Sequence, residues 1–232
     1  MKTVFLSASV PTVERSAEFH RVPNAHINIE EAVINLCRAI FNRGDRVVFG
    51  GHPSISPLVS MVASEFRNKA HDGKKLVIIY QSEAFRSAFL TKTLALLERL
   101  GTSEIHFTPA AGKERFDPTI KNVKQCVESL TEMRMSILGR APDVMVCIGG
   151  MEGVKDEYDL FLRYSKTKHL PVLLLPYTGG ATYNLAQAVE KPDNVRVIES
   201  QPLKAEISGK EIDLGIYPHA AISEEIVNNF FN

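Results

Sequence analysis

The stretch VMVCIGGMEGVKDEY, residues 144–158, joins five apolar residues to a glycine-rich turn and then to an amphipathic segment. A continuous apolar run of this length predicts a strand that is covered on both faces, as in a parallel sheet between two layers of helices. Similar short apolar runs alternate with helical patterns along most of the chain. The alternation predicts an α/β fold: a three-layer, doubly wound, mostly parallel sheet of the Rossmann-like kind.

The same patterns give the expected elements. Strands are expected at residues 4–8, 46–49, 76–80, 104–107, 144–148 and 172–175, with short strands at 195–197 and 205–207. Helices are expected from Asn28 to Gly44, from Ser56 to Phe66, and at 93–100, 118–139, 154–164, 181–189 and 223–231. Asn28 with Glu31 fits a capping box at the start of the first helix. We expect one domain over residues 1–232, in which residues 194–232 form an appendage of short strands and a helix.

Composition excludes several classes of function. The 232 residues carry 27 basic and 27 acidic side chains, whereas a nucleic-acid binder usually has a basic excess, so no nucleic-acid partner is expected. No apolar run is long enough to span a membrane and no signal peptide opens the chain, so we expect a cytoplasmic protein with no membrane partner. The three cysteines are widely spaced and no local metal motif occurs, which favours buried thiols, no metal site and no cofactor.

Four turns at strand ends are rich in glycine or in hydroxyl side chains. In doubly wound folds, ligands bind at the carboxyl ends of the strands, and a helix N-terminus at such a turn favours a phosphate or another anion. We therefore expect the ligand-binding residues to be Ser7, Ser9, Gly50, Gly51, His52, Gly149, Gly150, Met151, Glu152, Gly153, Thr178, Gly179, Gly180 and Thr182. Helix capping explains the two threonines equally well, and a turn position before proline explains His52.

Two common nucleotide motifs are missing. No Gly-x-Gly-x-x-Gly follows the first strand, and no phosphate-binding loop with a lysine occurs. Neither a nicotinamide-dependent dehydrogenase nor a phosphate-loop nucleotidase is supported. Tyr80 and Gln81, at the end of the third strand, are candidates for contact with a base.

The Gly50-Gly51 turn and the stretch GGMEGVKDEY, residues 149–158, resemble the two signature turns of the LOG/SLOG superfamily. This superfamily includes "lysine decarboxylase-like" phosphoribohydrolases, a DNA-processing branch and nucleotide-sensing SLOG domains of bacterial defence systems. The resemblance covers most of residues 3–190. It implies a SLOG-type α/β fold, a small nucleotide or nucleotide-derived ligand, and a homodimer.

Compared with the phosphoribohydrolase motif Pro-Gly-Gly-x-Gly-Thr-x-x-Glu, this chain has Ile148 for the proline, an inserted Glu152, and Val154 for the threonine. Glu157 matches the catalytic glutamate and Arg134 matches the arginine of an upstream motif. The resemblance therefore implies catalysis by Glu157 and Arg134. A carboxylate beside the anomeric carbon stabilises a sugar cation or activates water, and an arginine fixes phosphate.

The position of Arg134 depends on where its helix begins. If residues 118–139 form one unbroken helix, Arg134 lies near the helix C-terminus, at the wrong edge of the sheet. If a helix begins near Ser129 or Thr131, Arg134 lies in one of its first turns, on the same edge as Glu157. Asp156 and Glu152 are alternative carboxylates, and the long loop from Ser9 to Ala25 is a candidate lid.

Two functions follow from the resemblance. The first is an enzyme that hydrolyses or transfers at the N-glycosidic bond of a nucleotide or nucleotide-derived molecule. The second is a non-catalytic SLOG sensor of a nucleotide signal, with a separate effector protein, in bacterial anti-phage defence. The spacing from Arg134 through the double glycine to Glu157 motivates the first, which we favour. The changed turn around Glu152 and Val154 motivates the second.

Overall fold

The computed structural model describes residues 1–12, 17–70, 74–88, 99, 101–120 and 124–231. In this part of the chain, seven strands form one parallel sheet in the order β4-β3-β2-β1-β5-β6-β7. The strands are β1 (Thr3–Ser9), β2 (Arg46–Phe49), β3 (Val77–Ser82), β4 (Ser103–Thr108), β5 (Val144–Gly149), β6 (Val172–Leu175) and β7 (Val195–Val197). The parallel sheet confirms the predicted strand pattern.

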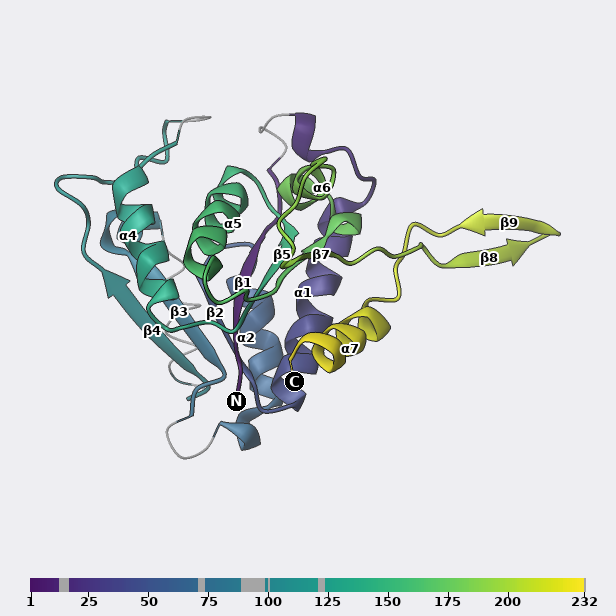
Figure 1. Cartoon of the computed structure of the whole chain (residues 1–232), viewed down its shortest axis with the longest axis horizontal. Helices are drawn as coiled ribbons and strands as arrows, with labels where there is room; N and C mark the ends of the chain where they lie inside the picture. Colours follow the sequence, from purple (N-terminus) through teal and green to yellow (C-terminus); the bar gives the residue numbers. More distant parts are fainter. Residues whose placement is uncertain (13–16, 71–73, 89–98, 100, 121–123, 232) are drawn as a thin grey trace.

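Six described helices cover the two faces of this sheet (Figure 1). The first layer contains α1 (Ala25–Asn42), α2 (Ser56–Glu65) and α7 (His219–Phe230); the second contains α4 (Val127–Leu138), α5 (Glu152–Ser165) and α6 (Gly180–Ala186). Along β5, Val144, Val146 and Ile148 pack in the core of the first layer, while Met145 and Cys147 pack in the core of the second. This period of two on a strand buried on both faces gives the three-layer α/β fold that the sequence predicts.

The strand order reverses between β1 and β5. The chain adds β2, β3 and β4 on one side of β1, and then crosses to add β5, β6 and β7 on the other. At such a point the connections diverge above and below the sheet and leave a crevice outside the carboxyl ends of the strands. Ser9 of β1 pairs with Gly149 of β5 at this crevice.

Several predicted element boundaries are wrong. Helix α1 begins at Ala25, three residues before the predicted cap Asn28. Asn28 therefore lies within the helix, and its side chain is buried. The described residues between 117 and 126 are not helical, so the single helix over 118–139 is also wrong. Cys126 has a left-handed backbone with a φ of 54°, and α4 starts directly after it. The helix predicted at 93–100 falls, except for Arg99, outside the described residues.

The short 3-10 helices lie in the connections. They are η1 (Ala17–Phe19), η2 (Arg67–Lys69), η3 (Glu83–Ala88) and η4 (Pro176–Thr178). A bond of 2.8 Å from the Phe116 amide to the Ala84 carbonyl ties the loop after β4 to η3. This loop therefore comes to lie beside the carboxyl end of β3.

Beyond the sheet, β8 (Lys204–Ile207) and β9 (Lys210–Asp213) form an antiparallel hairpin that projects away from the body (Figure 1). Lys204 pairs with Asp213, and Glu206 pairs with Glu211, so these four charged residues share one face. On the other face, Leu203, Ile212 and Leu214 are between 41% and 45% exposed, and Lys210 shares this face at the turn of the hairpin. The hairpin, which we call the arm, therefore has an uncovered apolar face. The sequence pattern missed β9.

The remaining whole-chain expectations concern membranes and thiols. None of the helices in the described ranges is long and apolar enough to cross a membrane. Cys37, Cys126 and Cys147 are free and buried, which confirms the expected buried thiols. Burial raises the pKa of the Cys37 thiol to about 12.

Candidate functional site

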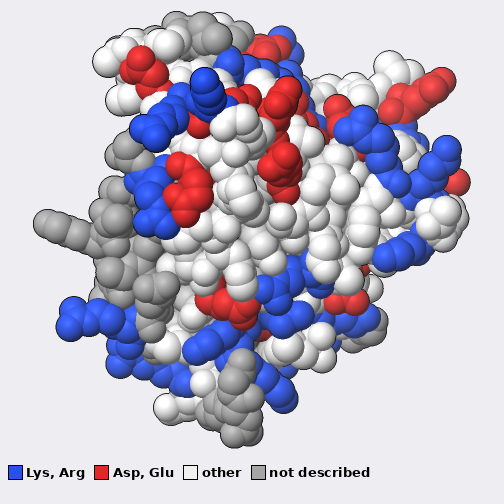
Figure 2. All heavy atoms as spheres, turned by 90° about the vertical axis from the view of Figure 1, so that its left-hand side faces the viewer, with Lys and Arg blue, Asp and Glu red and all other residues white. Residues whose placement is uncertain are grey.

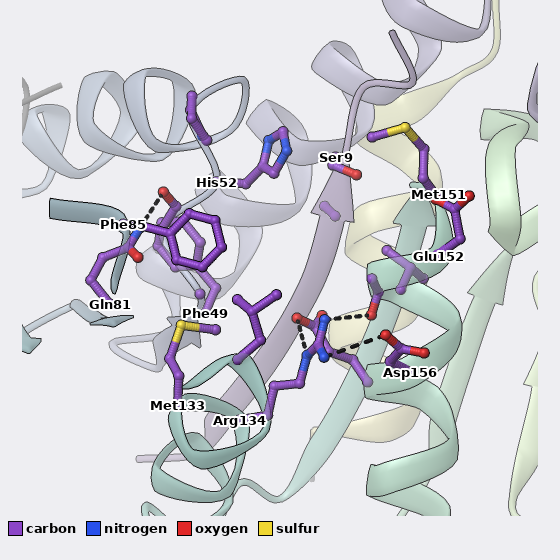
Figure 3. A pocket seen from close by; sticks show the side chains of 18 of the residues that line it. Ser9, Phe49, His52, Gln81, Phe85, Met133, Arg134, Met151, Glu152 and Asp156 are labelled. Atoms are coloured by element: carbon purple, nitrogen blue, oxygen red, sulfur yellow. Dashed lines mark hydrogen bonds and ion pairs between the residues drawn. The ribbon is translucent and has the colours of Figure 1, made fainter. Parts of the chain in front are cut away.

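A cavity of about 650 Å³ opens at the carboxyl edge of the sheet, between β1, β2, β3 and the N-terminal halves of α4 and α5 (Figure 3). This is the crevice where the strand order reverses, and its volume lies within the range of small-molecule sites. The predicted site residues that line it are Ser9, Gly50, Gly51, His52, Arg134, Met151, Glu152, Gly153 and Glu157, together with the alternative carboxylate Asp156.

Glu157 projects from the second turn of α5 and lies against the end of β1. Its Oε2 accepts a hydrogen bond of 2.5 Å from the Ser7 hydroxyl, and its side chain is 14% exposed. Burial raises the pKa of the Glu157 carboxyl, while the Arg134 charge and the Ser7 hydrogen bond act in the opposite direction. The site thus holds a carboxyl group that takes up a proton more readily than one in water, as a catalytic acid or base requires.

Arg134 lies beside Glu157, which resolves the question of its position. Its Nε is 3.5 Å from Glu157 Oε1, its Nη1 is 3.4 Å from Asp156 Oδ2, and its Nη2 is 3.5 Å from the Gly153 carbonyl. Arg134 is in the third turn of α4, which begins at Val127, and a helical side chain leans toward the helix N-terminus. The guanidinium therefore reaches the carboxyl edge of the sheet, where α5 supplies all three acceptors.

The described cations of the cavity wall, Lys124 and Arg134, are already paired with carboxylates. Lys124 Nζ is 3.0 Å from Asp156 Oδ1, so Asp156 joins both cations of the cavity wall, Lys124 and Arg134. An anionic ligand must therefore compete with carboxylates for these cations or use neutral donors.

The start of α5 supplies such neutral donors. Among the described residues, no acceptor takes a backbone hydrogen bond from the amides of Met151, Glu152 and Gly153. The first amides of a helix point out of its N-terminus and carry partial positive charge. All three residues line the cavity, which makes this helix end suited to a phosphate or carboxylate group.

The third glycine turn supports the site from behind. Thr178 Oγ1 accepts a 2.8 Å bond from the Gly149 amide, and Thr182 Oγ1 donates a 2.9 Å bond to the Gly149 carbonyl. Gly180 packs so closely that a Cβ there would lie 2.5 Å from the Gly149 carbonyl carbon. Thr178, Gly179, Gly180 and Thr182 are buried and, like Gly149 and Gly150, are not among the residues that line the cavity. Ser7 is likewise not among the lining residues and is linked to the cavity by its hydrogen bond to Glu157.

The apolar half of the cavity was missed from the sequence. Phe49, Phe85, Phe116, Leu130 and Met133 line it, and the rings of Phe85 and Phe116 stack with centroids 5.0 Å apart. These residues come from a strand end, η3, a loop and α4, so no local spacing in the sequence links them.

Of the two candidates for base contact, only Gln81 lines the cavity, where it donates a 2.9 Å bond to the Gly51 carbonyl. The hydroxyl of Tyr80 accepts a 2.6 Å bond from Arg140 instead. Tyr80 therefore belongs to a separate polar contact on the sheet.

In the candidate lid, residues 13–16 lie outside the described part of the chain.

The arrangement of metal-ligating side chains and of surface charges can be described for the residues that the structure covers. Its His, Cys, Asp and Glu side chains form no group of three that could hold a metal ion. On the face shown in Figure 2, the described basic and acidic side chains are interspersed around a broad uncharged area and do not form a continuous basic patch. Phosphate-backbone binding usually needs such a patch.

Comparison with known proteins gives one result. A family model described as the SLOG cluster3 family matches residues 18–200. No curated protein and no solved structure matches the chain. The matched range contains β2 to β7 and the glycine turns after β2, β5 and β6, but not β1 or the arm.

Proposed function

The chain belongs to the SLOG cluster3 family, and on this basis we propose that the cavity binds a nucleotide or nucleotide-derived ligand and that Glu157 acts on its N-glycosidic bond. Family membership supports a nucleotide-related function in general. The observation that carries the finer proposal is the buried Glu157 carboxyl, held by Ser7 and Arg134 at the crevice where the strand order reverses.

In the proposed reaction the bond between the anomeric carbon and the base nitrogen breaks, and the base leaves with the electron pair. The sugar passes through an oxocarbenium-like state, and a water oxygen, or a hydroxyl oxygen in a transfer reaction, forms the new bond to the anomeric carbon. The Glu157 carboxylate stabilises the positive charge and accepts the proton of the attacking group, while the departing base takes up a proton from solvent; Glu157 then returns its proton to solvent. Arg134 holds the carboxylate in place.

The ligand's phosphate is proposed to bind at the N-terminus of α5. The amides of Met151, Glu152 and Gly153 face the cavity, and both cations of the wall are already paired with acids. Backbone donors offer an anion a site that requires no ion pair to break.

The test is release of free base from nucleoside 5′-monophosphates. We expect Glu157→Gln to lower turnover about 10²- to 10⁴-fold, the usual contribution of one acid–base group, and to leave nucleotide binding nearly unchanged. Glu152→Gln is the matched control, because Glu152 lines the same cavity on the same helix but does not contact Ser7 or Arg134 among the described residues. Turnover by Glu157→Gln at the wild-type rate would refute the catalytic proposal.

A non-catalytic sensor of a nucleotide signal, acting through a separate effector in bacterial anti-phage defence, is the second candidate. Two observations favour it: both Glu157 oxygens are already engaged, and the apolar face of the arm is uncovered. Tight nucleotide binding by calorimetry without any base release would select the sensor. Absence of binding to every nucleotide tried would remove both candidates.

We also propose that residues 1–232 are one domain, with residues 194–232 as its appendage. The protein is proposed to be a cytoplasmic homodimer. The arm supports a homodimer because its apolar residues Leu203, Ile212 and Leu214 need a partner surface. Two such arms related by a two-fold axis would bring like face against like face.

A further inference from the structure

The apolar half of the cavity offers flat surfaces for a planar ring. The stacked rings of Phe85 and Phe116 lie 24° from parallel, and Phe49 and Met133 stand beside Phe85 (Figure 3). Aromatic side chains bind heteroaromatic rings by stacking, with little preference among rings. The aromatic wall (Phe49, Phe85, Phe116, Leu130 and Met133) thus gives affinity for a ring, but does not select which one.

His52 stands at the border between this wall and the polar half of the cavity, between Phe85 and Ser9 in Figure 3. Its Nδ1 accepts a 3.3 Å bond from the Ser54 amide and lies 2.8 Å from the Ser54 hydroxyl. The Ser54 oxygen in turn accepts a 3.1 Å bond from the Val10 amide. Since the Ser54 amide can only donate, Nδ1 must be the acceptor, and the neutral ring carries its proton on Nε2.

The Nε2–H group has no acceptor among the described residues, although His52 lines the cavity. No described acid or base makes a hydrogen bond or an ion pair with the ring. Burial lowers the pKa of His52 to about 4, so the ring stays neutral near pH 7. The His52 ring is therefore a neutral hydrogen-bond donor whose direction is fixed by Ser54. The amides at the start of α5 are better donors to a phosphate.

We infer that His52 is a specificity-determining residue: its Nε2–H donates to a carbonyl oxygen or ring nitrogen on the edge of a heteroaromatic ring that is seated on the aromatic wall. This inference rests on the proposed binding of a nucleotide-derived ligand and names the part of that ligand which His52 reads. Ser54 acts as a positioning residue, because it fixes the tautomer through its amide and its hydroxyl.

The test compares a ligand that has a ring with one that lacks it. Calorimetry measures the affinity of wild type, His52→Gln and His52→Leu for the 5′-monophosphates of adenosine, guanosine, inosine and cytidine, and for ribose 5-phosphate. For the tightest nucleotide we expect His52→Leu to bind about 10-fold more weakly, the value of one hydrogen bond whose partner is left unpaired. Binding of ribose 5-phosphate should not change, and His52→Gln, which keeps a neutral N–H donor, should restore most of the affinity.

Nitrogen-15 NMR of the His52 ring provides a second measurement, because it shows directly which ring nitrogen carries the proton. Wild type should show an unprotonated Nδ1 and a protonated Nε2, and Ser54→Ala should mix the two tautomers. A protonated Nδ1 in wild type overturns the inference, as does equal nucleotide affinity of wild type and His52→Leu. Those results leave the proposed function standing if wild type binds a nucleotide. If wild type binds none, the proposed function fails and the inference fails with it.

Discussion

Ser7 is one of the groups that oppose the effect of burial on the pKa of the Glu157 carboxyl, after the larger effect of the Arg134 charge. Its hydroxyl donates to Glu157 Oε2 at 2.5 Å and lowers the carboxyl pKa, whereas burial raises it. The net shift is upward, so ionised Glu157 costs folding free energy. Protonated Glu157 carries no such cost, so its contribution to stability is fully present below the unfolded-state pKa. This contribution is lost as the pH rises through the higher folded-state pKa.

Removal of the Ser7 hydroxyl should therefore shift the pH profile. In Ser7→Ala the pKa of Glu157 rises further, and if the carboxylate is the active form, the acid limb of kcat/KM moves to higher pH. The pH dependence of base release from a nucleoside monophosphate measures this limb. Ser9→Ala is the control, since Ser9 lines the cavity and, within the described part of the chain, makes no hydrogen bond to Glu157. A limb that stays in place or moves to lower pH contradicts the assigned role of Ser7.

At the scale of residues, the sequence predicts the polar residues of the cavity better than its apolar residues. Glu157 and Arg134 were identified from the resemblance to a family motif, and the structure brings their side chains within 3.5 Å. Phe85 and Phe116 were not identified, because they lie 31 positions apart in irregular segments and meet only through tertiary packing. Thr178 and Thr182 proved to bond Gly149, which is neither of the two roles that the sequence suggested, ligand contact and helix capping.

At the scale of elements, the carboxyl edge depends on two turns packed against each other. Gly180, at the start of α6, has a φ of 62° and touches the backbone of Gly149 and Gly150. The Ala181 amide donates a 2.8 Å bond to the Gly150 carbonyl. The turn after β6 thus fixes the turn after β5, and with it the start of α5 and the amides that face the cavity.

Gly180→Ala should destabilise the protein more than its backbone angle alone explains. A Cβ at this position would lie 2.5 Å from backbone atoms that cannot move aside, so we expect a loss of about 3 kcal/mol or more in the free energy of unfolding. Gly44 is the matched control: its φ is 77° and a Cβ added there would meet nothing within 4 Å, so Gly44→Ala should cost about 1 kcal/mol. Urea unfolding measures both, and equal losses would refute close packing as the cause.

Element type was more predictable than element boundaries. Apolar runs located the inner strands β1, β2, β3, β5 and β6, because strands buried on both faces are largely apolar. The edge strands β4 and β7 are only partly buried and carry charged residues. The start of α4 was left open, because the left-handed backbone at Cys126 has no signal in a residue other than glycine or asparagine. Arg134 stands in the third turn of α4 and reaches Glu157 because its long side chain leans toward the helix N-terminus.

At the scale of the whole molecule, the arm lies outside the family match, as do β1 and α7. The match ends at residue 200, and the arm begins at Leu203 with an apolar face on one side and charges on the other. An isolated two-stranded hairpin is marginally stable in water, so this one is expected to gain stability from a partner. The alternation in the sequence was visible, but not the direction in which the hairpin projects.

If the partner is a second copy, the 25.8 kDa chain should have about twice this mass in solution. Light scattering after size-exclusion chromatography measures the mass. Leu203→Glu combined with Leu214→Glu should give monomers, because carboxylates on the apolar face cannot be buried without a partner charge. Glu206→Lys changes a charge on the opposite face and should leave the dimer intact. A monomeric wild type, or a dimeric double variant, would exclude the arm as the dimer interface.

The strand order has a last consequence, for the time at which the chain can fold during synthesis. The bond from the Thr3 amide to Asp143, at the start of the β1–β5 pair, joins residues 140 positions apart. At a synthesis rate of about 5–20 residues per second, the central strand waits on the order of ten seconds for β5 to leave the ribosome. During that interval a strand whose side chains are almost all destined for the core has an open edge. Nascent chains of this protein are therefore expected to need a chaperone at β1 until β5 arrives.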